Sequence, residues 1–201
     1  DKDIRRFAQG VRLAAKPTVI IANKMDVAKA DENIEKMMQE FKDSIVVPCC
    51  AEAELALVRA EQKGMVEYVP GEETFRLLKK DELTKDQSWA LNYVQERVLS
   101  RWTQTGVQFA LNMCVFKLMR MNTVYPVEDE TRFSDKKGNV LPDVFLVDPA
   151  ATVRDVAREI HSDLAKNVIH GIDVRTGIRL PTDHVLRDRD ILKLVTAAGK
   201  K

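Results

Sequence analysis

Thr18-Val19-Ile20-Ile21-Ala22-Asn23-Lys24-Met25-Asp26 is the most informative stretch of the sequence. Its first five residues form an uninterrupted apolar run rich in β-branched side chains, which is typical of a strand buried on both faces in a parallel sheet. Apolar residues at helical spacing precede this run and recur over residues 34–41. A second short apolar run follows at residues 45–47. The order helix, strand, helix, strand predicts half of an open α/β sheet.

Length and composition exclude several classes of protein. The 201 residues, 45% of them hydrophobic, suffice for one or two domains with buried cores. A net charge of +1 gives no overall basic excess, so any RNA contact would have to be a local patch. The sequence has no apolar run long enough to span a bilayer and no signal peptide, so we expect a cytoplasmic protein without membrane contact. Composition leaves the oligomeric state open.

Residues 53–119 are predicted to be mainly helical. Thr84–Gln87 and Thr105–Gln108 both have the form of a capping box, in which the first side chain accepts from a backbone N–H three residues on. Apolar residues at helical spacing follow each of them, so two helices are expected to begin there. We therefore expect residues 1–119 to combine the α/β sheet with a helical insertion.

From residue 120 the pattern changes to that of a small α+β domain. Its predicted elements are a strand at 121–127, a turn at Asp135–Gly138, a strand at 140–147, a helix capped by Thr152 with an apolar face extending to Leu164, and strands at 168–174 and 191–196. The first two strands make a hairpin. The whole set predicts a β-grasp domain over residues 120–201.

Asn23-Lys24-Met25-Asp26 stands at the carboxyl end of the first predicted strand, where ligands bind in open α/β sheets. A carboxylate at Asp26 can accept from both N1–H and N2–H of guanine, whereas adenine presents an acceptor there. An unpaired, partly buried polar group costs on the order of 1–3 kcal/mol, which is enough for selectivity. Asn23 can bind the purine edge and tie the loop, and the stem of Lys24 can lie along the base. These residue types predict a guanine site.

The same four residues also fit an ordinary turn, in which Asn and Asp bind their own backbone. Their position favours the guanine site. The motif directly follows a predicted buried strand, and the next strand ends in Pro48-Cys49-Cys50-Ala51-Glu52, where a second base-contacting loop would be needed.

These two loops resemble the fourth and fifth motifs of the small GTP-binding domain, an Asn-Lys-x-Asp sequence followed one helix and one strand later by a Ser-Ala-Lys-like loop. The resemblance implies a set of guanine-binding residues, Asn23, Lys24, Asp26, Cys50 and Ala51. It also implies that the backbone N–H of Ala51 meets guanine O6. The chain departs from the family pattern in having Cys50 for Ser and Glu52 for Lys.

The second domain resembles a TGS domain, which is shared by threonyl-tRNA synthetase, a group of GTPases and the stringent-response nucleotide enzymes. The matching segments are Leu141–Leu146, Ala151–Ala157, Glu159–His161 and Val185–Ile191. The whole chain is similar to the C-terminal part of an Obg-family GTPase, most like the archaeal branch related to YchF. This implies a partial P-loop-type G domain over residues 1–119 and a TGS domain over residues 120–201. It also implies GTP or GDP as the ligand of the full-length parent, and a ribosome or tRNA-like RNA as the TGS partner.

The sequence lacks the phosphate loop of a GTPase. None of its eight glycines begins a GxxxxGK[ST] pattern, whose backbone and Lys hold the phosphates and whose hydroxyl holds Mg²⁺. The resemblance places that loop, and with it Mg²⁺, upstream of Asp1. The three cysteines and three histidines also lack the spacing of a metal site, so no metal ligands are predicted. We expect the chain alone to be unable to hydrolyse GTP.

A non-catalytic binding module is the alternative interpretation, with the TGS domain as the working part and the α/β half as a scaffold. Six arginines of the second domain alternate with acidic residues. This alternation indicates a solvated mixed-charge surface more readily than an RNA-facing patch.

Overall fold

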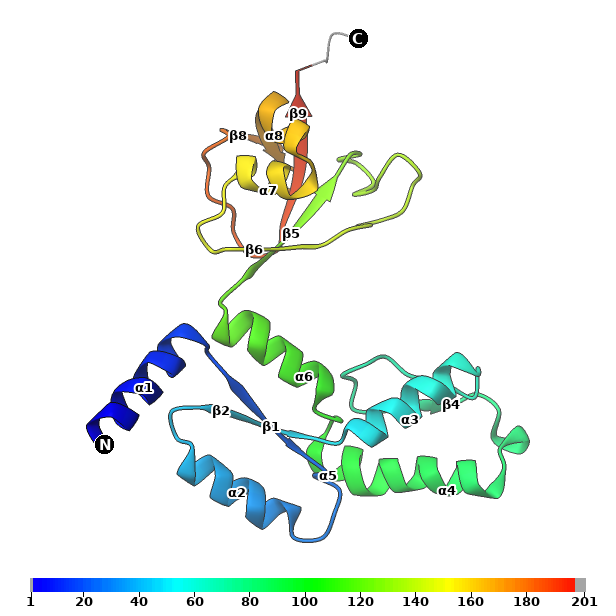
Figure 1. The fold of residues 1–201 in the computed structure, drawn as a ribbon. Coiled ribbons are helices and arrows are strands. Elements are labelled where there is room, and N and C mark those ends of the chain that lie inside the picture. The colour runs from blue at the N-terminus through cyan, green and yellow to red at the C-terminus, as the bar shows by residue number, and fades with distance from the viewer. Residues whose placement is uncertain (1, 198–201) are drawn as a thin grey trace. The chain divides into compact units, whose positions relative to one another are not determined.

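Two parallel strands, β1 (Val19–Asn23) and β2 (Ile45–Cys49), lie in the first part of the computed structural model (Figure 1). The structure describes residues 2–197, except the side chains of residues 13 and 14. Asn23 pairs with Cys49, so both strands end at the same edge. Helix α2 (Ala30–Glu40) connects them and contacts β2. The predicted α/β arrangement is confirmed, and the loops that follow the two strands are neighbours.

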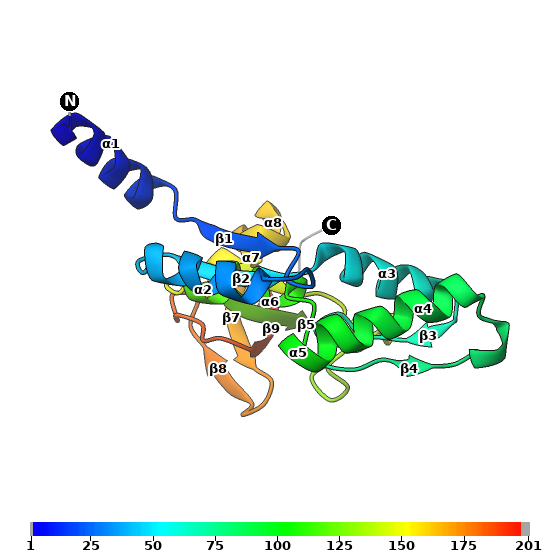
Figure 2. The same ribbon diagram turned by 90° about the horizontal axis from the view of Figure 1, so that it is seen from below.

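The chain divides after Met119 into two units, Asp1–Met119 and Arg120–Lys201. The other elements of the first unit are α1 (Lys2–Ala15), α3 (Ala51–Gln62), β3 (Val66–Glu67), β4 (Arg76–Leu77), the 3-10 turn η1 (Lys80–Glu82), α4 (Lys85–Val94), the π-helical turn η2 (Gln95–Leu99), α5 (Ser100–Trp102), α6 (Val107–Asn112) and the π-helical turn η3 (Met113–Leu118). Figure 2 shows α3 and α4 side by side with the β3–β4 ribbon next to them. Strands of two residues leave no alternating pattern, so the sequence did not predict this ribbon.

The core of the first unit anchors the loop that follows β1. Met25, in that loop, is 1% exposed and belongs to the same cluster as Leu57 of α3 and Val98 of η2. Burying a side chain of this size contributes roughly 1.5–3 kcal/mol. The buried Met25 therefore anchors the loop to the core, while the two residues before it, Asn23 and Lys24, stay exposed.

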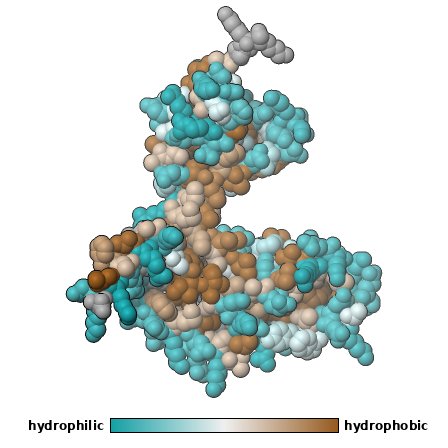
Figure 3. All heavy atoms as spheres, in the orientation of Figure 1, coloured by the Kyte–Doolittle hydropathy of each residue, from teal (hydrophilic) through white to brown (hydrophobic). Residues whose placement is uncertain are grey.

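Strand β1 is more exposed than its sequence predicts. Ile21 is 44% exposed, because within residues 2–197 β1 pairs with β2 alone. The apolar face of α1 is also open, with Phe7 73% exposed, and Figure 3 shows hydrophobic atoms at the surface over α1 and the β1–β2 ribbon. The prediction of burial on both faces is wrong for this stretch. An apolar run indicates which residues can be buried, but burial also needs a neighbouring element.

The two capping-box predictions have different outcomes. Thr84 Oγ1 accepts from the N–H of Gln87 over 3.2 Å, and Gln87 Oε1 accepts from the N–H of Thr84 over 2.9 Å, so α4 begins as predicted. The prediction at Thr105 is wrong. Gly106, with a φ of 85°, precedes α6 and turns the chain so that the Thr105 hydroxyl donates to the carboxylate of Glu54 instead.

The second unit is a five-stranded sheet packed against two helices. Its elements are β5 (Asn122–Val127), β6 (Phe145–Val147), α7 (Val153–Ile160), α8 (Ser162–Asn167), β7 (Val168–Asp173), β8 (Ile178–Leu180) and β9 (Asp190–Thr196). The strand order is β6-β5-β9-β7-β8, with β5 and β9 parallel and the other pairs antiparallel. Val124, Val156 and Leu192 are fully buried between sheet and helices. This arrangement confirms the predicted β-grasp fold.

The second strand of the predicted hairpin is shorter than expected. Only Phe145–Val147 pairs with β5, whereas the prediction extended over residues 140–147. Pro142 has no backbone N–H to donate, and Leu141 has a φ of 42°, so neither suits a regular ladder.

The helix that begins after Thr152 is interrupted at His161. The capping box of Thr152 and Asp155 is present as predicted, but α7 ends at Ile160 and does not continue to Leu164. His161 has extended backbone, and its Nδ1 accepts from the N–H of Asp163 over 3.1 Å. His161 therefore caps a separate helix, α8. Helical periodicity persists across the break, which is why the sequence predicted one helix.

Candidate functional site

Asn23 joins the two loops at the carboxyl ends of β1 and β2. Its Oδ1 accepts from the N–H of Lys24 over 2.8 Å and from the N–H of Ala51, the first residue of α3, over 3.1 Å. A third link runs from the N–H of Met25 to the carbonyl of Cys49 over 3.1 Å. Lys24 has a φ of 66°, a left-handed conformation that turns the chain between Asn23 and Met25. Backbone and side chain together hold both loops in one arrangement.

Asp26 is half-buried and holds a hydrogen bond on each carboxylate oxygen. The thiol of Cys50 donates to Oδ1 with an S···O distance of 3.2 Å. The hydroxyl of Tyr93, from α4, donates to Oδ2 over 3.1 Å. A carboxylate has about four acceptor positions, so each oxygen keeps one for a ligand.

Both donors to Asp26 hold their protons at neutral pH. Burial is the largest cause that raises the pKa of Cys50 to about 11; a hydrogen bond with the Ala53 backbone opposes the rise, and the hydrogen bond and charge of Asp26 add to it. Burial, then the hydrogen bond and charge of Asp26, also raises the pKa of Tyr93. The neutral thiol and phenol therefore act as hydrogen-bond donors that orient the carboxylate.

A cavity of about 470 Å³ opens at this edge of the sheet. It is lined by all five residues that the sequence indicated together with three neighbours, Asn23, Lys24, Asp26, Val27, Cys50, Ala51, Glu52 and Leu55. The structure thus brings the two predicted loops to one hollow. Its polar groups include the carboxylate of Asp26, the amide of Asn23 and the ammonium group of Lys24. The first turn of α3, whose backbone N–H groups lack intrahelical acceptors, adds further donors.

Ala51 has a different hydrogen-bond partner from the one that sequence reasoning assigned to it. Its N–H was expected to point at a ligand oxygen, whereas in the structure it donates to Asn23. Glu52, the next residue of α3, also lines this cavity. A ligand acceptor above this helix end can be reached by the Glu52 N–H, or by the Ala51 N–H if it is shared with Asn23.

A buried polar network supports the second loop from behind. The carbonyl of Thr105 accepts from the N–H of Cys50 over 2.8 Å, while the Thr105 hydroxyl and the Tyr68 hydroxyl both donate to Glu54. Burial, then the hydrogen bond to Glu54, raises the pKa of Tyr68 to about 12. A Cβ on Gly106 would lie 2.0 Å from the carbonyl oxygen of Pro48, so this segment sits directly against the loop.

Sequence reasoning missed Tyr93 and Thr105 as parts of this site. Tyr93 lies 67 residues after Asp26, and its helical pattern places it on α4 without indicating which residue its hydroxyl meets. The sequence pattern Thr105–Gln108 predicted a capping box, so Thr105 was assigned to the start of a helix and not to this site. No local spacing could have identified either residue.

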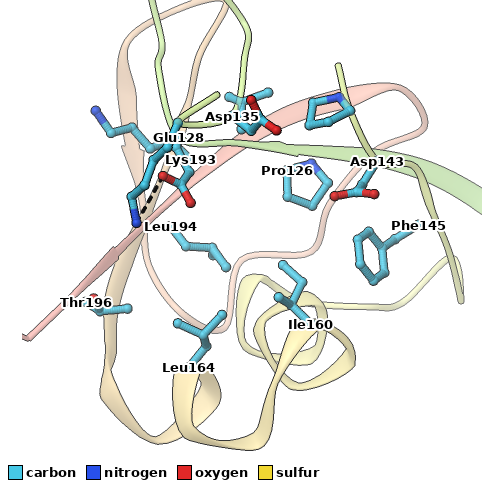
Figure 4. Close-up of a pocket in the computed structure, with 13 residues that line it drawn as sticks. Pro126, Glu128, Asp135, Asp143, Phe145, Ile160, Leu164, Lys193, Leu194 and Thr196 are labelled. Atoms are coloured by element: carbon cyan, nitrogen blue, oxygen red, sulfur yellow. Dashed lines mark ion pairs between the residues drawn. The ribbon is translucent and has the colours of Figure 1, made fainter. Parts of the chain in front are cut away.

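A second cavity, of about 410 Å³, lies in the second unit and is shown in Figure 4. Its apolar lining comes from strands and helices, at Pro126, Phe145, Ile160, Leu164 and Leu194. At its rim Lys136 pairs with Glu128 over 3.3 Å, and Lys193 pairs with Glu130 over 3.5 Å. Both lysines at the rim are thus paired with carboxylates of the same unit.

Two further features bear on ligands. No three potential metal ligands cluster among residues 2–197. Over the same residues, no helix combines the length and the apolar character that crossing a membrane requires.

Comparisons with known proteins match both parts of the chain. Residues 21–129 match the family described as "Obg-like GTPase YGR210-like, G4 motif-containing domain", and residues 132–196 match the TGS domain. A GTP-binding protein of Methanocaldococcus jannaschii is 42% identical over 198 residues, which cover 98% of this chain and 50% of that protein. A GTP-binding protein of Schizosaccharomyces pombe is 27% identical over 168 residues, covering 80% of this chain and 41% of that protein.

A solved structure is also similar. The crystal structure of a GTP-binding protein from Pyrococcus horikoshii matches with a TM-score of 0.71 and 39% identity, and the match covers 95% of this chain and 49% of that one. The chain therefore spans about half the length of the relatives that it matches.

Proposed function

Since this chain belongs to the Obg-like GTPase family, with a YGR210-like G4 motif-containing domain followed by a TGS domain, we propose that it binds the guanine base of GTP and GDP at the loops after β1 and β2. The family resemblance predicted from the sequence is confirmed. Relatives from Methanocaldococcus jannaschii and Schizosaccharomyces pombe are named as GTP-binding proteins, which supports a guanine nucleotide as the ligand.

The oriented carboxylate of Asp26 is the observation that carries this proposal. Cys50 and Tyr93 each occupy one position on the carboxylate and leave one on each oxygen for N1–H and N2–H of guanine. Adenine has no proton at N1 and no amino group at C2, so it would leave the two remaining acceptor positions of the half-buried carboxylate without donors. That mismatch costs on the order of 1–3 kcal/mol or more for a charged group.

The other residues complete the recognition of the base. Asn23 holds the loops together through Ala51 and can offer its amide N–H to the purine edge, since its oxygen is already used. Lys24 is exposed at the rim, where its stem can lie along the base plane. In this assignment Ala51 or Glu52 offers a backbone N–H to guanine O6, and Cys50 positions Asp26.

We assign only base recognition to these residues. The sequence contains no GxxxxGK[ST] loop, and the described side chains form no cluster that fits Mg²⁺. Phosphate binding, Mg²⁺ and hydrolysis are therefore proposed for the rest of a longer protein, consistent with relatives about twice as long as this chain. The 201 residues alone are proposed not to hydrolyse GTP.

We also propose that the TGS domain binds a ribosome or tRNA-like RNA partner. Arg175, Arg179 and Arg187 are among the arginines of this domain that have no carboxylate within ion-pair distance among residues 2–197, whereas Arg158 and Arg189 pair with Asp155 and Asp188. Unpaired guanidinium groups suit phosphate contacts. Replacing all three by Gln should weaken the binding of a structured RNA and reduce its dependence on salt concentration.

The guanine assignment is tested by Asp26→Asn in the full-length protein. An asparagine keeps an acceptor for N1–H but places an N–H opposite the 2-amino group of guanine. It suits xanthine, whose C2 carries an oxygen. We expect GTP affinity to fall by about tenfold to a hundredfold and xanthosine triphosphate affinity to rise, as measured by calorimetric titration. Glu52→Gln, which changes another carboxylate at the same cavity, should leave the ratio of the two affinities unchanged.

The scaffold alternative predicts a different result. If the α/β half serves only to support a TGS binding module, Asp26→Asn will alter neither affinity. That outcome would refute the guanine site and leave the TGS proposal standing.

A further inference from the structure

Tyr93 lies outside the two loops that follow β1 and β2, yet its hydroxyl donates a hydrogen bond to Asp26 Oδ2. It belongs to α4, in the helical segment that follows the second loop. Among residues 2–197, the side-chain donors to the Asp26 carboxylate are the Cys50 thiol on Oδ1 and the Tyr93 hydroxyl on Oδ2. The two loops therefore hold one oxygen, and the helical segment holds the other.

Two donors on the two oxygens determine the plane of the carboxylate. The terminal torsion of an aspartate is broad and roughly two-fold, so a single bond to Oδ1 would leave the plane free to rotate. Selective pairing with guanine requires both remaining acceptor positions to point into the cavity at once. The Tyr93 bond supplies the second constraint that this geometry needs.

Tyr93 itself is held in place by α4. The helix starts at the capping box of Thr84 and Gln87, and Leu91 and Val94, on either side of Tyr93, are 5% and 4% exposed in the core. The Tyr93 ring also packs against Trp89, with ring centroids 5.4 Å apart. Because these contacts are all independent of a nucleotide, the hydroxyl is prepositioned to orient Asp26.

We propose that Tyr93 is a positioning residue for guanine recognition, through which the helical segment sets the orientation of Asp26. The proposal rests on the guanine site proposed above. It adds that the affinity for the guanine base depends on a residue of α4, a helix outside the two loops. Trp89 is 68% exposed and stacks on Tyr93, so its fluorescence reports the environment of the Tyr93 ring.

Tyr93→Phe in the full-length protein removes one oxygen and keeps the ring. We expect GTP to bind about threefold to tenfold more weakly, the range for loss of one ordinary hydrogen bond, because the hydroxyl acts on the base only through Asp26. Tyr125→Phe in the second unit is the matched control. Tyr125 is partly buried and has no side-chain hydrogen bond among the described residues, so its variant should bind GTP like the parent protein.

A double-mutant cycle separates positioning from general structural support. Asp26→Ala removes the group on which Tyr93 acts, so Tyr93→Phe should cause no further loss of GTP affinity in the Asp26→Ala background. A loss of the same size in both backgrounds would mean that Tyr93 acts through the fold and would overturn the inference. Urea unfolding of each variant checks that the first unit is intact.

Trp89 emission provides the second measurement. In a variant of the full-length protein whose single tryptophan is Trp89, saturating GTP should change Trp89 fluorescence when Tyr93 is present, and much less in the Tyr93→Phe variant. Unchanged GTP affinity and an unchanged fluorescence response in Tyr93→Phe would refute the inference while leaving the guanine site intact. Absence of GTP binding by the unmodified full-length protein would refute the guanine site itself, and the inference with it.

Discussion

The backbone N–H of Ala51 donates to the side-chain oxygen of Asn23 over 3.1 Å, across 28 residues of sequence. This single bond joins the loop after β1 to the start of α3. Asn23 also accepts from its neighbour Lys24, so one amide oxygen fixes two backbone segments. The asparagine of the motif is therefore a structural tie within the cavity as well as a candidate ligand contact.

Asn23→Ala should weaken both the fold and base binding. The substitution removes two hydrogen bonds at an exposed position, and we expect the free energy of unfolding to fall by about 1 kcal/mol. GTP affinity of the full-length protein should fall by more than stability alone explains, because the two loops lose their link. Urea unfolding and calorimetric titration measure the two effects. Asn33→Ala, at an exposed position of α2, should change neither quantity appreciably.

Gly106 should tolerate no side chain. A Cβ there would lie 2.0 Å from the Pro48 oxygen and 2.9 Å from Cys49 Cα, and the residue has a φ of 85°. We expect Gly106→Ala to reduce the free energy of unfolding by about 3 kcal/mol or more, since left-handed strain adds to a backbone clash. Gly64→Ala is the matched control, with a φ of 65° and open space around its Cβ, and should cost only about 1 kcal/mol. Equal losses in the two variants would show that the contact with Pro48 is unimportant.

Local signals predicted the parts of the fold that depend on local structure. The apolar run before Asn23 predicted β1, and the capping boxes at Thr84 and Thr152 are present because their bonds span only three residues. Asp26 and Cys50 fall on one cavity because the two strands are parallel and end at the same edge. The order strand, helix, strand predicts that the two strands are parallel, so the sequence could predict this meeting of two loops.

Other features depend on partners that the sequence does not identify. The hydroxyl of Thr105 has the signal of a helix cap but meets the carboxylate of Glu54, 51 residues away. The bond from Tyr93 to Asp26 depends on the tertiary packing that brings α4 next to the loop after β1. The exposure of Ile21 depends on which elements flank β1, and its apolar character gives no information about them. In each case tertiary packing, and not local preference, decides the outcome.

Cys50 should make folding stability sensitive to alkaline pH. Burial raises the pKa of its thiol from 9.0 to about 11, so the folded state holds this proton more tightly than the unfolded chain. The resulting stability is fully present below pH 9 and is lost as pH rises toward 11. A shift of this size corresponds to a loss of roughly 2–3 kcal/mol. Cys50→Ser, which keeps a donor for Asp26, should remove that part of the pH dependence while retaining GTP affinity. Urea unfolding at pH 8, 9, 10 and 11 compares the two proteins, and parallel curves would contradict the prediction.

Asp188 should make the second unit sensitive to acid. Its Oδ1 accepts from the N–H and from the hydroxyl of Thr123, both over 2.8 Å, and these bonds lower its pKa below the ordinary 3.8. The folded state therefore favours the ionised form, and the stability it provides is present above pH 4 and lost as pH falls below it. Asp188→Asn should weaken the pairing of β5 with β9 at neutral pH. It should also make the stability of the second unit less dependent on pH in the acidic range. Amide hydrogen exchange of the two strands measures both effects. Asp183→Asn, at an exposed position of the same unit, should behave like the unmodified chain. If both variants lose protection equally, the pairing of Asp188 with Thr123 does not stabilise the sheet.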